Sequence, residues 1–127
     1  MKKYAGLLVT LAAIILVVGG LVYLNQRQGA VPGQYDKFAQ CLTDKGAKFY
    51  GASWCPHCAE QKRLFGTSMK HIAYVECALP NGQQGQTQAC TDAKIDSYPT
   101  WVFADGSRLN GEQQPSALAA KAGCSLQ

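Results

Sequence analysis

The sequence has little of the one-sided charge that nucleic-acid-binding surfaces carry. Charged residues make up 16% of the 127 residues, and the formal net charge at pH 7 is +4. Lys2, Lys3 and Arg27 supply three of the twelve basic side chains, which leaves nine basic against eight acidic side chains in the rest of the chain. The positive charge is therefore concentrated near the N-terminus, and we expect no nucleic-acid partner.

No charge at all occurs in the stretch 4–24, YAGLLVTLAAIILVVGGLVYL. A helix of this length would extend about 31 Å, close to the hydrocarbon thickness of a bilayer. The apolar run exceeds the roughly 7–15 residues of a cleaved signal peptide, and Val18 and Gly20 form only a poor cleavage site. We predict an uncleaved transmembrane signal anchor. Cleavage and a buried soluble helix are the alternatives.

The flanking charges set the expected orientation of this anchor. Lys2 and Lys3 precede the span and only Arg27 closely follows it, which favours a cytoplasmic N-terminus over residues 1–3. The chain would then be a single-pass protein of the inner or plasma membrane. Residues 25–34, NQRQGAVPGQ, are typical of a linker, and residues 35–127 would form a periplasmic or extracellular domain.

Repeats and low-complexity tracts are also missing, and residues 35–127 show alternating helix and strand patterns. Proline at a helix start, glycine at a helix end and short apolar runs are the signals used. They predict helices at 34–46, 56–66, 87–95 and 115–124, strands at 47–52, 71–77 and 99–105, and a hairpin turn at Asp105–Gly106 into a further strand. This order predicts an α/β fold with a mixed, four-stranded sheet.

Cysteine, in contrast, is plentiful for so short a chain. Six cysteines follow the apolar stretch, at positions 41, 55, 58, 77, 90 and 124. An even number of cysteines in a small exported domain is typical of disulfides. The cysteine count and the predicted topology are independent observations, and both indicate an oxidising compartment.

Two of these cysteines lie in SWCPHCAEQK, residues 53–62, between a predicted strand and a helix. Cys55 directly precedes Pro56, so unpaired backbone N–H groups and the helix dipole favour its thiolate. His57 adds a positive or hydrogen-bonding group beside the pair. We therefore expect Cys55 to be the attacking, more exposed thiol and Cys58 to be the resolving one.

A zinc site and a structural disulfide are the alternative interpretations of the same motif. Zinc usually needs a second pair of ligands, but the remaining cysteines are widely spaced and His57 and His71 are the two histidines. A disulfide between Cys55 and Cys58 would close a loop too short to restrict the unfolded chain much. We expect redox chemistry by the two thiols, with no metal and no cofactor.

The segments FYGASWCPHCAEQKRLFG, YVEC, TQAC and SYPTW together resemble the thioredoxin superfamily. Within it they are most similar to the thioredoxin-like domain associated with bacterial vitamin K epoxide reductase homologues, over most of residues 35–123. The resemblance implies a thioredoxin-like fold with Pro99 in the cis form beside Cys55. It also implies that the main chain of Tyr98 hydrogen-bonds an incoming substrate.

The resemblance further implies disulfide exchange with exported proteins and with a membrane quinone-linked enzyme. This chain lacks the helices of that reductase, so a vitamin K epoxide reductase-like partner would be a separate polypeptide. The active-site dipeptide Pro56-His57 matches that of the periplasmic oxidant DsbA, which favours oxidation. Phe49 stands where thioredoxin and DsbA carry a buried acid. Glu60 and Glu76 are conceivable substitutes, but we expect both to be surface charges.

The same resemblance suggests how the other four cysteines pair. The related domains have cysteines at the positions of Cys77 and Cys90, and a bond between these two would close the polar loop between them. In a thioredoxin fold the first and last helices can lie on one face of the sheet, so a Cys41–Cys124 bond is feasible. A second redox relay through Cys77 and Cys90 is the alternative to structural disulfides.

Tyr50 and Trp54, close to the motif, each have two interpretations, a place in the core or on a surface that faces substrate. Trp54, next to Cys55, is expected to line a substrate-facing surface where an exposed ring supports a docked peptide. Tyr50, Trp101 and Phe103 are expected in the core.

Together these observations predict a membrane-anchored, extracytoplasmic thiol-disulfide oxidoreductase that passes disulfides to exported proteins. Two alternatives stay open: a disulfide reductase or isomerase, and a non-catalytic anchored binding or assembly domain.

Overall fold

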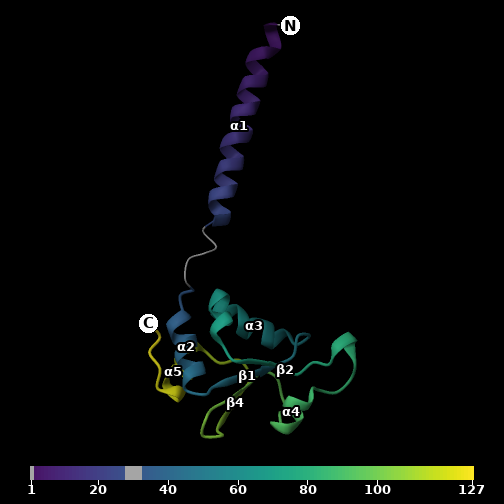
Figure 1. Ribbon diagram of the computed structural model, residues 1–127, viewed down its shortest axis with the longest axis vertical. Coiled ribbons are helices and arrows are strands. Elements are labelled where there is room, and N and C mark those ends of the chain that lie inside the picture. Colours follow the sequence, from purple (N-terminus) through teal and green to yellow (C-terminus); the bar gives the residue numbers. More distant parts are fainter. Residues whose placement is uncertain (1, 28–32) are drawn as a thin grey trace. The chain divides into compact units, whose positions relative to one another are not determined.

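The computed structural model describes residues 2–27 and 33–127, with the side chains of 2–5, 7 and 24–27 left out. The chain divides into two compact units, Met1–Val31 and Pro32–Gln127. Helix α1, Lys2–Arg27, belongs to the first unit (Figure 1). Among the residues described, we find no helix with the length and apolarity that crossing a membrane requires. The anchor stays a prediction, and residues 28–32 of the predicted linker lie outside the described residues.

The second unit is built on a sheet of four short strands in the order β2-β1-β3-β4. Strand β1 pairs in parallel with β2 and antiparallel with β3, which in turn pairs antiparallel with β4. The mixed four-stranded sheet predicted from the sequence is therefore confirmed. The strands are β1 Lys48–Gly51, β2 Tyr74–Glu76, β3 Thr100–Val102 and β4 Arg108–Asn110.

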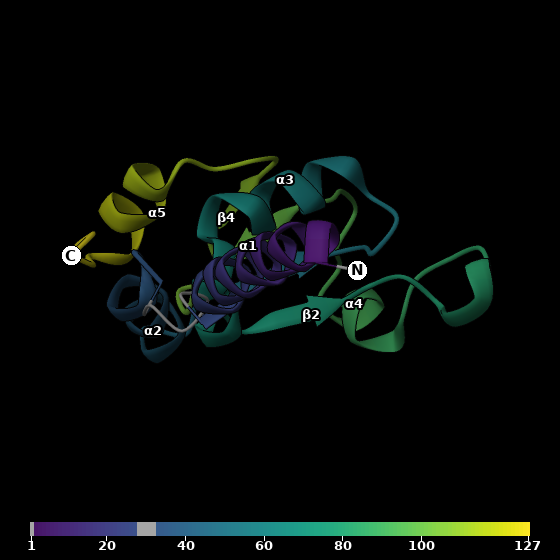
Figure 2. The same ribbon diagram turned by 90° about the horizontal axis from the view of Figure 1, so that it is seen from above.

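Helices cover both faces of this sheet because side chains alternate along its strands. Phe49 and Trp101 contribute to a large apolar cluster that includes residues of three helices: α2 Asp36–Asp44, α3 Pro56–Phe65 and α5 Pro115–Ala122. Tyr50, the next residue on β1, instead contributes to a smaller cluster with α4, Gln88–Asp92. The short α4 thus packs on the opposite face from α2, α3 and α5 (Figures 1 and 2).

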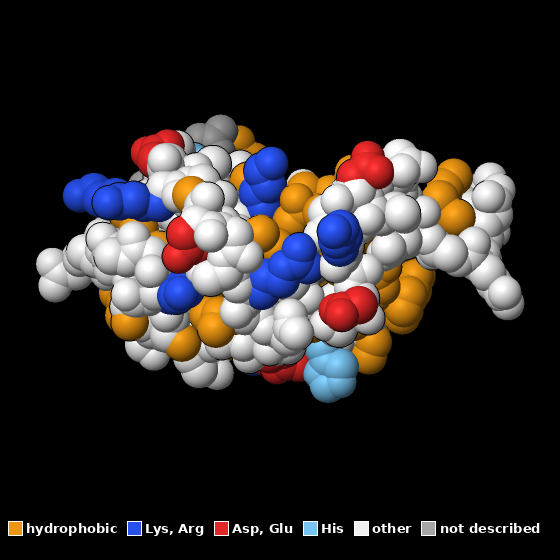
Figure 3. All heavy atoms as spheres, turned by 90° about the horizontal axis from the view of Figure 1, so that it is seen from below, with side chains coloured by type: hydrophobic (Ala, Val, Ile, Leu, Met, Phe, Trp, Pro, Cys, Tyr) orange, Lys and Arg blue, Asp and Glu red, His pale blue; other side chains and the backbone are white. Residues whose placement is uncertain are grey.

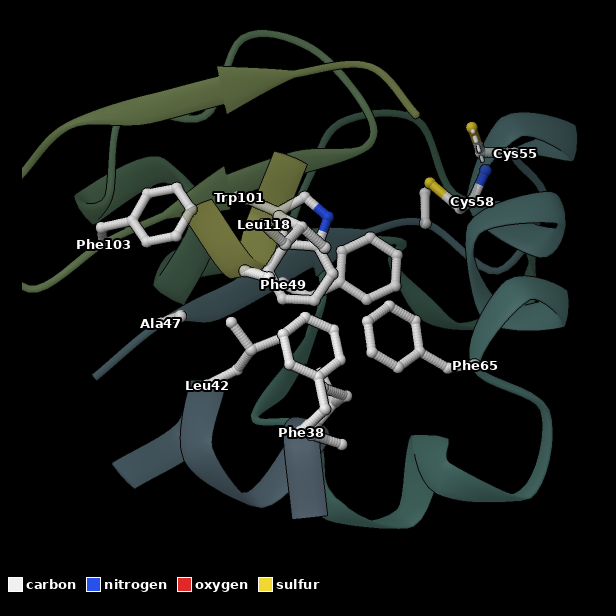
Figure 4. Packing of buried hydrophobic residues seen from close by; sticks show 14 residues of the cluster. Phe38, Leu42, Ala47, Phe49, Cys55, Cys58, Phe65, Trp101, Phe103 and Leu118 are labelled. Carbon is white, nitrogen blue, oxygen red and sulfur yellow. Dashed lines mark hydrogen bonds between the residues drawn. The ribbon is translucent and has the colours of Figure 1, made fainter. Parts of the chain in front are cut away.

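Stacked aromatic rings form the centre of the larger cluster. The rings of Phe49 and Trp101 stack with centroids 5.0 Å apart, and those of Phe38 and Phe65 stack at 5.8 Å (Figure 4). Leu118 of α5 is fully buried in the same cluster. Trp101 and Phe103 are core residues, as expected, and so is Tyr50 in the smaller cluster.

Two disulfides connect elements that lie far apart in the sequence. Cys41 of α2 is bonded to Cys124, just beyond α5, with their Cα atoms 6.0 Å apart. This bond joins two helices that lie side by side (Figure 2). Cys77, directly after β2, is bonded to Cys90 of α4. Both partners of the second bond are fully buried in the smaller cluster, away from Cys55 and Cys58, which favours a structural role for it.

Local structure differs from the sequence prediction mainly at element ends. The predicted helix 56–66 ends at Phe65 and continues as a 3₁₀ helix over Gly66–His71, so β2 begins later than expected. Thr87 occupies the N-cap position of α4, but its hydroxyl donates to the carbonyl of Glu76 and makes no cap bond. The strand end and the start of α4 are thereby tied together. Gly106 adopts a φ of +80° in the turn before β4.

We predict that breaking the Cys41–Cys124 bond strongly destabilises the chain. The bond joins residues 83 positions apart, and in the chain-entropy model its loss costs about 4–5 kcal/mol. The measurement is denaturant unfolding of the oxidised full chain, followed through tryptophan fluorescence. Cys41→Ala, Cys124→Ala and the double variant should lose the same stability, since each breaks the same bond. A double variant as stable as the wild type would contradict the prediction.

Candidate active site

The two unpaired cysteines of the described chain meet at the start of helix α3. Cys55 is the N-cap residue and Pro56 is the first helical residue, where proline's fixed φ and missing N–H are tolerated. The Sγ of Cys55 accepts a hydrogen bond from the backbone N–H of Cys58 at 3.4 Å (Figure 4). Cys55 therefore faces the unpaired N–H groups of the first helical turn, where negative charge is favoured.

The loop before β3 lies against this pair. The Tyr98–Pro99 peptide bond is cis, and the Tyr98 carbonyl oxygen lies 3.8 Å from the Cys55 Sγ. Pro99 is fully buried, and the Tyr98 hydroxyl donates to the side chain of Gln86. The structure thus brings Cys55 and the Tyr98 main chain together from segments more than 40 residues apart in the sequence.

The environments of the two thiols differ. Cys55 is 6% exposed and Cys58 only 1% exposed, so Cys55 is the more accessible sulfur, although both are buried. Burial raises the pKa of the Cys58 thiol to about 12, and the nearby Cys55 adds to this, while the Ala52 backbone and Lys62 act in the opposite direction. Since the thiolate is the nucleophile, this arrangement suits attack at or by Cys55 first and leaves Cys58 for a later, assisted step.

His57 is exposed to solvent but has a carboxylate partner. Its Nδ1 lies 2.5 Å from the Oε1 of Glu112, in the loop after β4. That loop is held by Gln61, a fully buried residue of α3. The side chain of Gln61 donates to the Gln113 carbonyl at 3.0 Å and accepts from the Gln113 N–H at 2.7 Å. A carboxylate is thereby placed beside the active-site histidine.

Trp54 is an exposed aromatic residue next to Cys55. Its side chain is 67% exposed, and its ring meets the ring of Tyr98 edge-on, with centroids 5.8 Å apart. Two open hollows adjoin it, with volumes of about 610 and 370 Å³. Both are lined by Trp54 and by the loop 78–85, which the Cys77–Cys90 bond closes.

Glu60 and Glu76 have different surroundings. Glu60 pairs with Arg63 on the outer side of α3, as a surface charge does. Glu76 is partly buried, and its carboxylate accepts from the Tyr74 hydroxyl and from the backbone N–H groups of Ser53 and Ala78, each at 2.9 Å. Glu76 is therefore neither buried nor a free surface charge, because three donors hold its half-buried carboxylate in place.

Sequence analysis missed three of the residues found around the site. Gln61, Tyr74 and Glu112 take part through contacts between elements distant in the sequence, and nothing in the local pattern of Tyr74 or Glu112 distinguishes them from core or surface residues. A polar residue on the apolar side of α3 was the one available signal, and it points to Gln61. Within residues 2–27 and 33–127, no three His, Cys, Asp or Glu side chains are grouped as metal ligands would be.

The charged side chains of the domain are mixed in sign. On the face shown in Figure 3, lysines and arginines alternate with aspartates and glutamates, with apolar side chains between them. This face presents no field of one sign.

The mixed sheet, its flanking helices and a Cys-Pro-His-Cys pair beside a cis proline define a thioredoxin-like domain with a dithiol site. The chain is 46% identical over 92 residues to the thiol-disulfide oxidoreductase LTO1 of Arabidopsis thaliana. The matched region is 69% of this chain and 24% of that protein, so the chain spans about a quarter of its relative's length. No family model matches the chain. The similarity supports a thioredoxin-like oxidoreductase.

We predict that iodoacetamide modifies Cys55 and spares Cys58 in the native, reduced chain at pH 7. With a pKa of about 12, about one Cys58 thiol in 10⁵ is ionised at that pH, and its sulfur is buried. Peptide mass spectrometry gives the rate at each site. In a Cys55→Ala control, Cys58 should remain slow and should react faster with rising pH throughout the range 8–11. Equal rates for the two thiols at pH 7 would contradict the assignment.

We also predict that Gln61→Leu destabilises the domain. The substitution leaves the N–H and C=O of Gln113 without their partner, at a cost of about 1–3 kcal/mol for each group that stays buried. Thermal or denaturant unfolding measures the change. Gln40→Leu is the matched control, because Gln40 is exposed and bonds only Asp44 within its own helix, and it should change stability by less than about 0.5 kcal/mol. Equal effects of both variants would argue against the bridging role.

Proposed function

We propose that the chain is a membrane-anchored, extracytoplasmic thiol-disulfide oxidoreductase with Cys55 and Cys58 as its catalytic residues. The observation that carries the proposal is the contrast among the six cysteines. Four are bonded in two disulfides, while Cys55 and Cys58 are unpaired at a helix start, with the Tyr98 carbonyl 3.8 Å from the Cys55 sulfur. The similarity to a curated thiol-disulfide oxidoreductase supports the same chemistry.

In the oxidising direction a substrate thiolate attacks the Cys55 sulfur of a Cys55–Cys58 disulfide. The bond between the two cysteines breaks, Cys58 leaves as a thiolate and takes up a proton, and a mixed disulfide joins the substrate to Cys55. A second substrate thiolate then attacks the substrate sulfur of that bond. The substrate gains a disulfide, Cys55 leaves as a thiolate, and two electrons remain on the reduced pair.

The substrates in this proposal are the thiols of exported proteins. Trp54 offers an exposed ring beside Cys55, and the neighbouring hollows along the loop 78–85 offer space for an extended segment. The Tyr98 main chain lies within reach of a polypeptide bonded to Cys55. These features support docking of a peptide across the site, with Pro56 and His57 at its edge.

Reoxidation would require a partner that accepts two electrons. We assign this role to a separate, vitamin K epoxide reductase-like membrane protein linked to quinones, on the resemblance of residues 35–123 to domains associated with such enzymes. An anchor at residues 4–24, with residues 1–3 cytoplasmic, would keep the domain beside that partner on the periplasmic or extracellular side of the inner or plasma membrane. No metal or organic cofactor takes part in the steps described.

The reverse direction, disulfide reduction or isomerisation, is the second candidate function. The observation that favours it is the Glu112 carboxylate bonded to His57. A negative charge there offsets the positive charge that His57 would offer to a thiolate, and stabilising the thiolate is what makes such a pair oxidising. Pro56 and His57 favour oxidation by resemblance, so the two directions differ in a measurable reduction potential.

The proposal predicts that Cys58→Ala accumulates mixed disulfides through Cys55. Without the second thiol, a complex formed by Cys55 cannot be resolved from within the protein. The full chain is expressed in its membrane, free thiols are blocked, and adducts are detected on non-reducing gels and identified by mass spectrometry. Cys55→Ala is the control and should give no adducts.

Absence of thiol-dependent adducts in Cys58→Ala would leave a non-catalytic binding or assembly domain as the better interpretation. If adducts form, the reduction potential of the wild-type pair, measured against glutathione, decides the direction. A reduction potential of about −120 mV fits an oxidant, and one of about −270 mV fits a reductase.

A further inference from the structure

Disulfide exchange requires Cys58 to carry negative charge in either direction. It leaves as a thiolate when a substrate attacks Cys55, and it must become a thiolate to attack a mixed disulfide at Cys55. Burial opposes that charge, since the Cys58 side chain is 1% exposed. Phe49, which stacks on Trp101 in the same cluster as Cys58, has no charged or hydrogen-bonding group to offer the thiol. Another residue has to offset the cost.

The space above Gly51 shows which side chains surround Cys58. A Cβ placed on Gly51 would lie 3.1 Å from the Cys58 Sγ and 3.1 Å from the Cε2 of Tyr74. The thiol and the tyrosine ring therefore both border the space above Gly51, a residue that has no side chain of its own. Lys62 completes the group, because its Nζ lies 3.8 Å from the centroid of the Tyr74 ring.

Lys62 is placed there by helix geometry and by the ring beneath it. It follows Cys58 by four residues on α3, so the two side chains lie on the same side of the helix. An ammonium group over an aromatic face is attracted by the ring's quadrupole, which holds the flexible lysine over Tyr74. The position of the ring is in turn fixed by the bond from the Tyr74 hydroxyl to Glu76.

Glu76 is unsuited to act as the base for Cys58. Burial alone would raise its pKa, but the bonds from Ala78, Tyr74 and Ser53 and the charge of Lys62 outweigh burial and keep the pKa below its usual value. The carboxylate therefore stays ionised at neutral pH. Its three hydrogen bonds make it a fixed support for the ring and for the turn that leads into Cys55.

We propose that Lys62 supplies the positive charge that stabilises the Cys58 thiolate during exchange, with Tyr74 and Glu76 as the residues that position it. This inference rests on the proposed function and names how its buried thiol is assisted. The proton of Cys58 passes to or from solvent or substrate.

The other titratable groups around Cys58 do not supply that charge. Cys55 raises the pKa of the Cys58 thiol, whereas Lys62 lowers it. Burial raises the pKa of Tyr74, as do its bond to Glu76 and the charges of Glu76 and the two cysteines. The pKa of Tyr98 is raised as well, chiefly by burial. Both phenols therefore remain neutral near pH 7. Lys62 is the cation acting on Cys58 among these groups.

The size of the effect follows from thiol chemistry. For each unit by which the pKa of Cys58 rises, the thiolate fraction at neutral pH falls tenfold, while the more basic thiolate becomes about threefold more nucleophilic. The net rate of attack by Cys58 therefore falls about threefold per unit. The pH at which the rate levels off rises by as many units as the pKa of Cys58 does.

Stopped-flow reaction of the reduced full chain with 5,5′-dithiobis(2-nitrobenzoate) separates the two thiols. Cys55 attacks the reagent and releases one thionitrobenzoate, and Cys58 then attacks the mixed disulfide at Cys55 and releases a second. Lys62→Met should slow the second release, by about threefold for each unit by which the pKa of Cys58 rises, and should move its pH profile upward, leaving the first release unchanged. Lys62→Arg should restore both, since it keeps the charge. Lys37→Met, which removes an exposed lysine of α2, is the matched control.

The outcomes separate this inference from the proposed function. If the wild type never releases the second thionitrobenzoate, Cys58 does not resolve a mixed disulfide and the exchange function itself fails. If the wild type releases it and Lys62→Met behaves identically, only the role of Lys62 is overturned. The role is also overturned if Lys62→Arg is as slow as Lys62→Met while both unfold at the wild-type temperature. Slowing confined to Lys62→Met, with a shifted pH profile, supports it.

Discussion

The stacking of Phe49 on Trp101 is the contact on which the geometry of the site depends. The two rings come from neighbouring antiparallel strands, and the ring of Phe65 packs against Trp101 from the end of α3. β1 leads into Cys55, β3 follows directly after Pro99, and α3 carries Cys58. One aromatic cluster therefore sets the distance between the thiols and the Tyr98 carbonyl, and its apolar character leaves no acid behind the buried sulfur.

That apolar interior changes how the chemistry is assisted. With Phe49 in the core, Lys62 provides the charge near Cys58 from its position over the Tyr74 ring of β2. Gly51 has no side chain, so the Cys58 thiol and the Tyr74 ring can both lie close to it. On the outer side of the same helix, Glu112 reaches His57 because buried Gln61 holds its loop. The site thus has two charged groups of opposite sign at its margin, Lys62 near Cys58 and Glu112 beside His57.

The sequence allowed the motif and the sheet to be predicted, because proline before a helix, alternating strands and paired cysteines are local signals. The partners of Cys41 and Cys77, and the position of Pro99, followed from resemblance. The hydrogen bonds of Glu76 could not be predicted, because its donors come from Ser53, Tyr74 and Ala78 and no local pattern shows that β2 ends beside the turn before Cys55. Gln61 and Glu112 depend on contacts across about 50 residues, which periodicity does not encode.

The disulfides Cys41–Cys124 and Cys77–Cys90 mean that the protein is itself a product of thiol oxidation. A newly made chain carries six thiols, and four must be closed into the correct pairs before the fold that shapes its active site is complete. Maturation of the fold therefore requires an oxidant that accepts two electrons for each of the two bonds. Once closed, the Cys77–Cys90 bond is fully buried, so the folded chain shields it from attack by external thiols.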